Sequence, residues 1–344
     1  MGYDAFLLVS FGGPEGPEDV MPFLRNVTRG RGVPDERLVE VAEHYRHFGG
    51  VSPINAQCRA LLDAVRVEFA VAGIELPLYW GNRNWDPYLV DTVRQLRDDG
   101  IQSALAFVTS PYGSYSSCRQ YLEDIERARA EVEGAPWIDK IRHYHDHPGY
   151  VEPHTDAVRA ALATLPAERR ATTRLVFTAH SIPTSMAATA APDGGRYEAQ
   201  LREVAALVAA SAAADLPWDL VWQSRSGPPQ VPWLEPDIND HLTALAAAGT
   251  TGVVLSPIGF SSDHLEVLWD LDTEAADTAK RLGLDFARAA TPGTDARFVT
   301  MIRELVTERI DPSTPRQALG TIPTWDFCAV GCCPTGRPRA ATPA

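Results

Sequence analysis

The sequence predicts an α/β protein made of two doubly wound, Rossmann-like domains with parallel sheets, followed by a short irregular C-terminal extension. Three observations support this prediction. Apolar strand-like runs alternate with amphipathic helical segments, the runs are apolar almost throughout, and the second half of the chain repeats the plan of the first. Strands that are apolar on both faces are typical of parallel sheets covered by helices on each side.

The first half of the chain contains four predicted strands. The apolar runs that predict them are 4–13, 76–84, 103–113 and 140–148. Amphipathic segments at 52–73 and 88–100 lie between these runs, and each ends at a glycine, which is a usual helix stop. We expect these elements to form an N-terminal α/β domain over residues 1–150.

The second half of the chain contains three further strand-like runs. These runs are 174–183, 218–228 and 252–264, and the helical segments between them are 197–214 and 237–249. We expect a C-terminal α/β domain over residues 151–312. The last segment, 313–344, is rich in Pro, Thr, Gly and Cys and predicts an irregular extension.

The composition excludes several classes of protein. The 344 residues carry a formal net charge of −14, whereas a nucleic-acid-binding surface requires a surplus of lysine and arginine. No apolar run reaches the length of a membrane span, and the first residues lack the pattern of a signal peptide. We therefore expect a cytoplasmic monomer with no nucleic-acid partner and no stable membrane insertion.

An acidic row stands out in the stretch "DHLEVLWDLDTEA", residues 263–275. If this stretch is helical, Glu266, Asp270 and Glu274 lie on one face, with His264 just ahead of them. Taken alone, such a row is more often a solvated helix face. The other sides of this helix are apolar, which predicts burial, and buried carboxylates require partners, metals or protons.

A histidine follows another strand, in "FTAHSIP". A lone histidine at a strand end, such as His180, is more often a hydrogen-bonded structural residue. In doubly wound sheets, however, ligands bind beyond the carboxyl ends of the strands, where His180 and the Glu266 face would meet. A histidine beside carboxylates suits a divalent cation in transit or proton removal from a substrate. No nucleotide-binding fingerprint is present.

The chain contains five cysteines, of which three lie within six residues. These three are Cys328, Cys332 and Cys333, and the other two are Cys58 and Cys118. In a reducing cytoplasm, this clustering favours metal ligation over disulfides. Cys58 lies in a helical pattern, and we expect it to be a core residue.

The sequence resembles the ferrochelatases, which insert ferrous iron into a porphyrin. The resemblance covers about residues 3–310, and the motifs that carry it are "LLVSFGGPEGPEDV", "HYRHFGGVSPIN", "GNRNWDPY", "YSSCRQY", "FTAHSIP", "WQSRSGPPQVPWLEPDI" and "PIGFSSDHLEVLWDLDTEA". It implies a chelatase-like fold, with a distorted porphyrin held in an interdomain cleft. The sequence of these motifs is similar to that of the actinobacterial branch of the family. This similarity implies that the substrates are coproporphyrin III and Fe²⁺ and that the product is coproheme. It also implies a coproheme decarboxylase as the downstream partner.

The resemblance implies a role for each matching residue. His180 would bind the metal and accept pyrrole protons, with Glu266 as its acidic partner across the porphyrin plane. His264, Asp270 and Glu274 would guide iron or protons along a helix with π-type widening. The implied porphyrin-contacting residues are Ser52, Tyr121, Trp233 and, on the propionate side, Arg29 and Tyr45. The remaining position is Phe11, where some relatives have a tyrosine that contacts the metal. A phenyl ring has no ligand atom, so the resemblance does not decide from which side the iron enters.

The resemblance also extends to the cysteines. Many actinobacterial members hold a [2Fe–2S] cluster with one cysteine from the body and three from a C-terminal extension. The matching ligands are Cys118, Cys328, Cys332 and Cys333. A zinc site with the same four ligands is the main chemical alternative, and free thiols are another.

Three alternatives to the coproporphyrin reading stay open. Protoporphyrin IX is the nearest alternative substrate. The chelatase fold also serves cobalt and nickel insertion, although the motif "SRSGPPQVPWLEP" argues against cobalt chelatases. A non-catalytic tetrapyrrole-binding protein is the third alternative, and the intact pair of His180 and Glu266 argues against it, because a carrier does not need a base.

Overall fold

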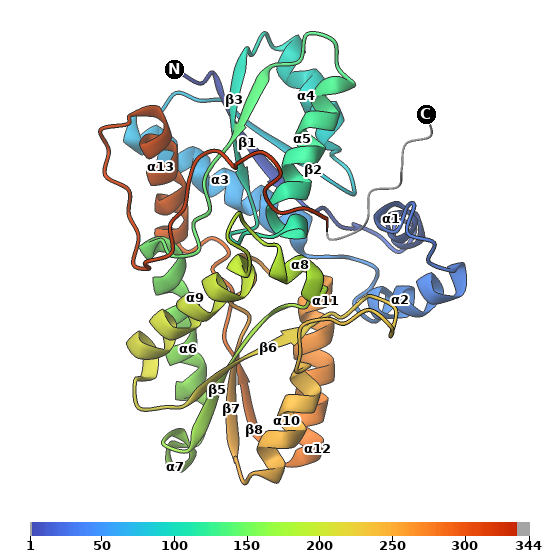
Figure 1. Ribbon diagram of the computed structural model, residues 1–344, viewed down its shortest axis with the longest axis vertical. Helices are drawn as coiled ribbons and strands as arrows, with labels where there is room; N and C mark the ends of the chain where they lie inside the picture. Colours follow the sequence, from blue (N-terminus) through green and yellow to red (C-terminus); the bar gives the residue numbers. More distant parts are fainter. Residues whose placement is uncertain (1, 336–344) are drawn as a thin grey trace.

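Two four-stranded parallel sheets form the centre of the protein, whose computed structural model describes residues 2–335 (Figure 1). The strand orders are β2-β1-β3-β4 and β6-β5-β7-β8, so the second half repeats the topology of the first. The strands of the first sheet are β1 (Ala5–Ser10), β2 (Leu78–Asn82), β3 (Ser103–Val108) and β4 (Trp137–Lys140). Those of the second are β5 (Thr173–His180), β6 (Trp218–Gln223), β7 (Gly252–Ser256) and β8 (Asp285–Arg288). The predicted fold class is confirmed.

Helices cover both faces of the first sheet. They are α3 (Ile54–Ala72) on one face and α4 (Leu89–Asp98) with α5 (Gln120–Ala130) on the other. Phe6 and Leu8 of β1 belong to the core that includes α3, whereas Leu7 and Val9 belong to the core formed with α4 and α5. Successive strand residues face opposite sides, so burial on both faces explains why the whole strand is apolar.

The second sheet is covered in the same way. The helices on one face are α6 (Pro148–Thr164) and α9 (Arg196–Ala213). Those on the other face are α10 (Ile238–Ala247) and a long helix that runs through α11 (Leu265–Val267), a π-helical segment (Leu268–Ala275) and α12 (Ala276–Leu282). The stretch that carries the acidic row is therefore helical, as predicted.

The two halves share one continuous core. The C-terminal helix α13 (Ala296–Ile310) returns to the first half and packs against both α3 and α6 (Figure 1). The hydroxyl groups of Tyr112 and Tyr150 both donate to the carbonyl oxygen of Ile258, at 2.7 and 2.6 Å. These contacts fix the relative position of the sheets. The boundaries at 150 and 312 stay predictions, and residues 336–344 of the predicted extension lie outside the described residues.

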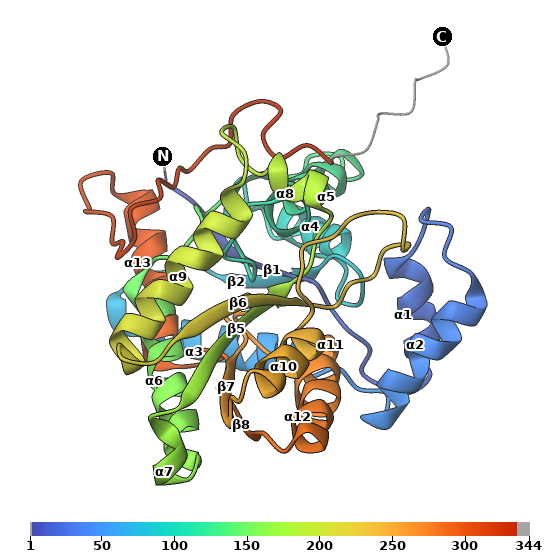
Figure 2. The same cartoon turned by 60° about the horizontal axis from the view of Figure 1, so that its bottom comes forward.

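A small helical lobe stands apart from the two sheets (Figure 2). It consists of α1 (Val20–Val27) and α2 (Asp35–His47), which pack on each other through Phe23, Leu38 and Tyr45. Leu265, at the start of the long helix, belongs to the same apolar cluster. The lobe therefore docks on the helix that carries the acidic row. The remaining short helices are a π-helical turn (Tyr115–Arg119), α7 (Ala167–Arg170) and α8 (Thr184–Ala188).

Two strand assignments differ from the prediction. The strand expected at 140–148 is wrong: β4 ends at Lys140, and residues 141–147 are irregular up to the start of α6. Ile141 and Tyr144 gave this run its strand-like pattern, but both fill the core: the Ile141 N–H donates to the Ala106 carbonyl of β3 at 2.9 Å, and the register with β3 ends at Lys140. The short strand β8 was not predicted, because its four residues "DFAR" carry charges at both ends. Among the described residues, no helix is long and apolar enough to cross a membrane.

Candidate active site

The candidate site lies where the strand order reverses in the second sheet. β5 has β6 on one side and β7 on the other, and ligands bind beyond the carboxyl ends of strands at such a point. His180 is the last residue of β5, and Glu266 lies in the helix that follows β7. Nε2 of His180 lies 3.9 Å from Oε2 of Glu266, and the side chains are 34% and 52% exposed. The structure thus brings the two predicted residues together and leaves both open to a ligand.

The hydrogen bonds around His180 define which nitrogen is available for chemistry. Nδ1 lies 2.5 Å from the carbonyl oxygen of Ser181, which can only accept a hydrogen bond, so Nδ1 carries a proton. In the neutral ring the lone pair is then on Nε2, the atom that faces Glu266. The Tyr197 hydroxyl donates to the carbonyl oxygen of His180 at 2.9 Å and holds the strand end in place. His180 can therefore accept a proton or bind a metal through Nε2.

The acidic row runs along a widened part of its helix. The π-helical segment Leu268–Ala275 includes Asp270 and Glu274, and such segments occur frequently at functional sites. Arg288 pairs with the neighbouring carboxylates of Asp263 and Asp272, at 2.9 and 2.6 Å. Within residues 2–335, by contrast, no ion pair involves Asp270 or Glu274. The row therefore keeps carboxyl groups that no side-chain cation neutralises.

The surroundings of Asp270 change the protonation of its carboxyl group. Burial raises its pKa to about 7, and the nearby Glu266 and Glu274 add to this effect. The Ser224 hydroxyl donates to Oδ2 of Asp270, and the Gln223 amide does so at 3.3 Å. These bonds oppose the rise, but the carboxyl group still exchanges its proton near neutral pH.

His264 lies beside this group, at the start of the helix. Burial lowers the pKa of His264, Glu266 opposes this effect, and His180 adds to it. Its ring packs edge-on against Phe260, with 5.0 Å between the ring centroids. The predicted path residue is therefore close enough to His180 and Glu266 to share their electrostatic environment.

Comparison with known proteins gives the family of the chain. The profile of the ferrochelatase family matches residues 3–310. The chain belongs to the ferrochelatase family. This result confirms the predicted family and the predicted class of enzyme, a metal chelatase.

Individual relatives agree with this assignment over almost their whole length. A protein of Nocardia farcinica named coproporphyrin III ferrochelatase is 58% identical over 353 residues, which cover 99% of each chain. Proteins with the same name from Streptomyces coelicolor and Mycolicibacterium smegmatis are 55% and 56% identical, covering 98% and 94% of this chain and 95% and 94% of theirs.

Among solved structures, SirB from Bacillus subtilis with Fe³⁺ is similar in fold. Its TM-score is 0.54 at 12% identity, with coverage of 90% of this chain and 97% of that chain. The cobalt complex of the sirohydrochlorin chelatase SirB from the subspecies spizizenii gives a TM-score of 0.51 at 10% identity, covering 91% and 97%. At these identities the likeness supports the fold alone, and it agrees with the predicted chelatase-like architecture.

Two of the four aromatic residues that the ferrochelatase resemblance places at the porphyrin are buried. Tyr45 is 6% exposed and packs against Phe23, with 5.9 Å between ring centroids. Tyr121 is also buried, beneath the guanidinium group of Arg83, which lies 3.7 Å from the centre of its ring. The same guanidinium group lies 5.9 Å from the ring of Phe11, which is 36% exposed.

Arg83 therefore lies between two residues that the resemblance places at the porphyrin, and the sequence patterns assigned it no role. It pairs with Asp124, and that pair is buried. The signal was present in the motif "GNRNW", which we quoted for the resemblance without assigning a role to its arginine. A buried arginine between Phe11 and Tyr121 joins the turn after β1 to α5.

Two further predicted contacts lie in loops, Ser52 between α2 and α3 and Trp233 between β6 and α10. Ser52 is buried and its backbone N–H donates to the Pro14 carbonyl at 2.9 Å. Gly13 faces it so closely that a Cβ there would lie 2.7 Å from the Ser52 Cβ, so only glycine fits this turn. Trp233 forms an antiparallel bridge with Pro183, just beyond His180.

The helical lobe touches the acidic helix through stacked rings. His44 stacks on Trp269 with 3.9 Å between ring centroids and an angle of 9°, and His47 packs edge-on at 5.6 Å. Burial lowers the pKa of His44, and Glu274 opposes this. The family resemblance did not predict this contact, which places a histidine of α2 beside the acidic row. Arg29 lies in the turn after α1 and is exposed.

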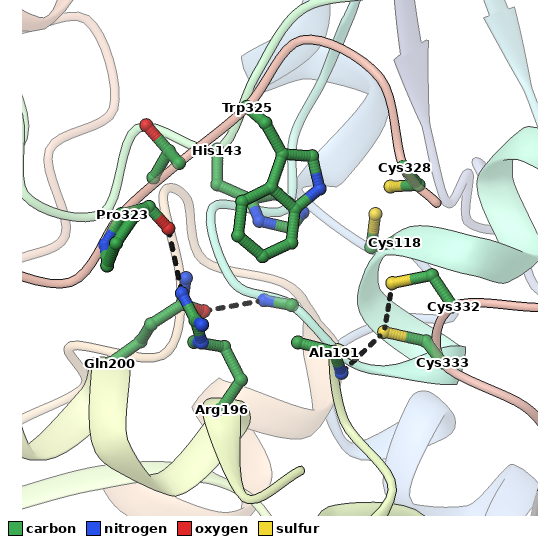
Figure 3. A pocket seen from close by; sticks show the side chains of 12 residues that line it. Cys118, His143, Ala191, Arg196, Gln200, Pro323, Trp325, Cys328, Cys332 and Cys333 are labelled. Carbon is green, nitrogen blue, oxygen red and sulfur yellow. Dashed lines mark hydrogen bonds between the residues drawn. The ribbon is translucent and has the colours of Figure 1, made fainter. Parts of the chain in front are cut away.

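Four cysteines meet in a second place, between the body and the C-terminal extension (Figure 3). The sulfur atoms of Cys118, Cys328, Cys332 and Cys333 point toward one another (Figure 3). The Cys332 and Cys333 sulfurs are 3.6 Å apart, and the Ala191 N–H donates to the Cys333 sulfur at 3.1 Å.

The surroundings of these sulfurs differ: a hydrogen bond with Cys328 and burial raise the pKa of Cys118, and burial raises the pKa of Cys332 to about 12. The pKa of Cys328, in contrast, is lowered to about 6, mainly by a hydrogen bond from Cys118 and also by the charge of Lys140, against the opposing effect of burial. Arg196 also lines the pocket (Figure 3). Cys118 lies in the short π-helical turn Tyr115–Arg119, which sequence reasoning did not anticipate. Cys58, in contrast, is buried in the core on α3, as predicted.

Proposed function

We propose that the protein inserts Fe²⁺ into coproporphyrin III and releases coproheme. The observation that carries this proposal is the arrangement of His180 and Glu266, with a lone pair on Nε2 of the histidine 3.9 Å from a carboxylate oxygen. The substrate is supported by the shared name of relatives that are 55–58% identical over nearly their full length.

The chemistry requires a base because metal insertion exchanges one Fe²⁺ for two pyrrole protons. Nε2 of His180 accepts a proton from the macrocycle, and the adjacent carboxylate of Glu266 stabilises the imidazolium ion that forms. The two protons leave as the metal enters, so the charge in the site is unchanged by the reaction. A site complementary to a distorted porphyrin would favour the transition state over the planar ground state.

The acidic row supplies a route for the exchanged charges. Glu266, Asp270 and Glu274 follow one another along the helix, and the pKa of about 7 at Asp270 suits alternate binding of a proton and release of it. Mutual repulsion between these carboxyl groups would be offset by a passing cation. His264 and His44, which border the row, would assist at its two ends.

The porphyrin would lie against residues from several turns. The proposed contacts are Ser52, Tyr121, Tyr45, Arg29, Phe11 and Trp233. Because Tyr45 and Tyr121 are buried, their contribution would be to support the surface on which the macrocycle lies. Exposed Phe11 has no ligand atom for the metal, so metal binding through a side chain falls to His180 and Glu266.

The four clustered cysteines fit a [2Fe–2S] cluster. Four thiolates is the number such a cluster requires, and the four converging sulfurs, with an N–H donor and the cations Lys140 and Arg196 nearby, match that requirement. When bound, a cluster would supply a covalent link between Cys118 in the body and the extension. Zinc uses the same ligands, so metal and acid-labile sulfide analysis of the purified protein distinguishes the two.

The experiment that tests the function is anaerobic insertion of Fe²⁺ with coproporphyrin III and protoporphyrin IX offered side by side. We expect coproporphyrin III to be used in preference, which would place the enzyme before a coproheme decarboxylase. Preference for protoporphyrin IX would keep the chemistry and change the substrate. Insertion into neither porphyrin would favour a tetrapyrrole-binding role. A sedimentation measurement would test the expected monomer.

A further inference from the structure

A second group of metal-binding side chains lies outside the active site and outside the cysteine pocket. His145, Asp146 and Glu203 each offer a ligand atom, and these atoms all lie within 4.8 Å of one another. His145 and Asp146 belong to the irregular segment between β4 and α6, whereas Glu203 lies on α9. None of the three takes part in the proposed iron insertion, so the inference goes beyond that function.

The group is buried and its polar atoms are poorly satisfied. His145 is 0% and Asp146 2% exposed. Among the described residues, neither ring nitrogen of His145 has a hydrogen-bond partner, and the same holds for Oδ1 of Asp146 and Oε2 of Glu203. Nε2 of His145 lies 3.5 Å from Oε2 of Glu203. Buried polar groups in folded proteins are almost always paired, so these atoms require a common partner.

A cation would satisfy these atoms together, because carboxylate oxygens and an imidazole lone pair are all acceptors. Two carboxylates and an imidazole lone pair cannot satisfy one another. The adjacent arginine, Arg142, is committed elsewhere: its guanidinium group binds Glu308 at 2.8 and 3.1 Å and the Gln317 carbonyl at 3.0 Å. One imidazole and two carboxylates are a common ligand set for zinc and similar divalent ions.

We propose that His145, Asp146 and Glu203 bind one divalent transition-metal ion of the zinc type, which fastens the C-terminal extension to the body of the protein. The link to the extension follows from the hydrogen bonds that Glu203 and Asp146 also accept from backbone N–H groups of the extension. Oε1 of Glu203 accepts from the backbone N–H groups of Thr321 and Ile322, at 2.6 and 3.2 Å. The Asp146 carbonyl accepts from the Leu319 N–H at 2.8 Å.

The position of these bonds explains why a metal is useful there. They hold residues 319–322 against α9, a few residues before Cys328. The described part of the extension, up to residue 335, contains no helix or strand after α13, so side-chain and backbone contacts position it. A cation that fixes Glu203 and Asp146 would fix the anchor points of the segment that brings the three cysteines to Cys118.

The test is a count of bound Zn²⁺ in the full chain and in matched variants. Asp146→Asn removes a ligand charge but keeps the backbone carbonyl that holds Leu319. Glu198→Gln, on the same helix as Glu203, makes an equal charge change outside the group. After equilibrium dialysis, we expect the wild type and Glu198→Gln to hold about one equivalent of Zn²⁺ more than Asp146→Asn. His145→Gln should lose the same equivalent and provides a second variant if Asp146→Asn does not fold.

The cysteines and His180 are also proposed metal ligands, so the lost ion must be assigned to its own ligands. Co²⁺ serves as the probe, because thiolate ligands give intense sulfur-to-cobalt absorption that nitrogen and oxygen ligands do not. We expect Asp146→Asn to keep the thiolate absorption and to lose only the remaining cobalt signal, and we expect faster amide exchange at Thr321 and Ile322. Two results would overturn the proposal: equal metal content in the wild type and both ligand variants, or loss of the thiolate signal alone. Either result would mean that His145 and Glu203 form an ion pair without a metal.

Discussion

Nε2 of His180 faces Oε2 of Glu266 at 3.9 Å, while Nδ1 of the same ring is held by the Ser181 carbonyl. The two contacts together orient the ring and select its tautomer. A histidine held in this way presents its basic nitrogen to whatever lies between it and the carboxylate. This relationship underlies the first prediction, because it assigns proton acceptance to one atom.

Replacing His180 with alanine should abolish iron insertion while leaving the fold intact. Positioned general bases contribute about 10²–10⁴-fold to rate, so we expect a loss of at least about 100-fold in kcat. Circular dichroism and thermal melting should match those of the wild type, because the side chain is 34% exposed and its hydrogen bond is to the neighbouring Ser181 carbonyl. Near-normal turnover by a folded His180→Ala variant would exclude this residue as the base.

Substitutions in the acidic row should change the KM for Fe²⁺ more than the KM for the porphyrin. Glu274→Gln removes one charge from the row, and we expect the KM for Fe²⁺ to rise by about tenfold, the lower end of the range for electrostatic focusing of a charged substrate. Glu168→Gln, an equal charge change on the exposed helix α7, is the control. The KM for coproporphyrin should be unchanged in both variants. An equal effect of the two substitutions would mean that only overall charge matters.

The sequence predicted candidate site residues where these residues fall at a regular helical spacing or at the end of an apolar strand. Asp270 and Glu274 fall at a helical spacing, and His180 ends an apolar strand, so the carboxyl edge of the sheet could be located from the sequence. Spacing does not show which carboxyl groups are already neutralised. The pairing of Asp263 and Asp272 with Arg288 depends on β8, a strand too short and too polar to be predicted.

Contacts between distant segments were also not predicted, because local sequence patterns do not specify tertiary packing. The stacking of His44 on Trp269 joins the helical lobe to the acidic helix, and nothing in either local pattern specifies it. Arg83 lies over Tyr121 because α5 packs beside the turn after β2, a matter of tertiary packing. The wrong strand at 140–148 illustrates the opposite error, since buried residues such as Tyr144 produce a strand-like pattern without a strand.

The buried carboxyl group of Asp270 should reduce stability as the pH rises. Its pKa is raised from the ordinary value of 3.8 to about 7 in the folded protein, so the folded state binds more protons than the unfolded state between these values. Stability from this group is therefore present below about pH 3.8 and is lost as the pH rises toward 7. Asp270→Asn should melt at a higher temperature than the wild type at pH 8, with a smaller difference at pH 5. A difference that does not depend on pH would contradict the raised pKa.

The last prediction concerns the cysteine pocket. Cys332→Ala should remove the visible absorption of a bound iron–sulfur cluster, because a cluster of this type requires all four thiolates. Cys58→Ala is the matched control, since Cys58 is buried on α3 away from the other four sulfurs and should leave the spectrum unchanged. Loss of zinc without any change in visible absorption would identify a zinc site with the same ligands. An unchanged spectrum and unchanged metal content in Cys332→Ala would exclude this cysteine as a ligand of either.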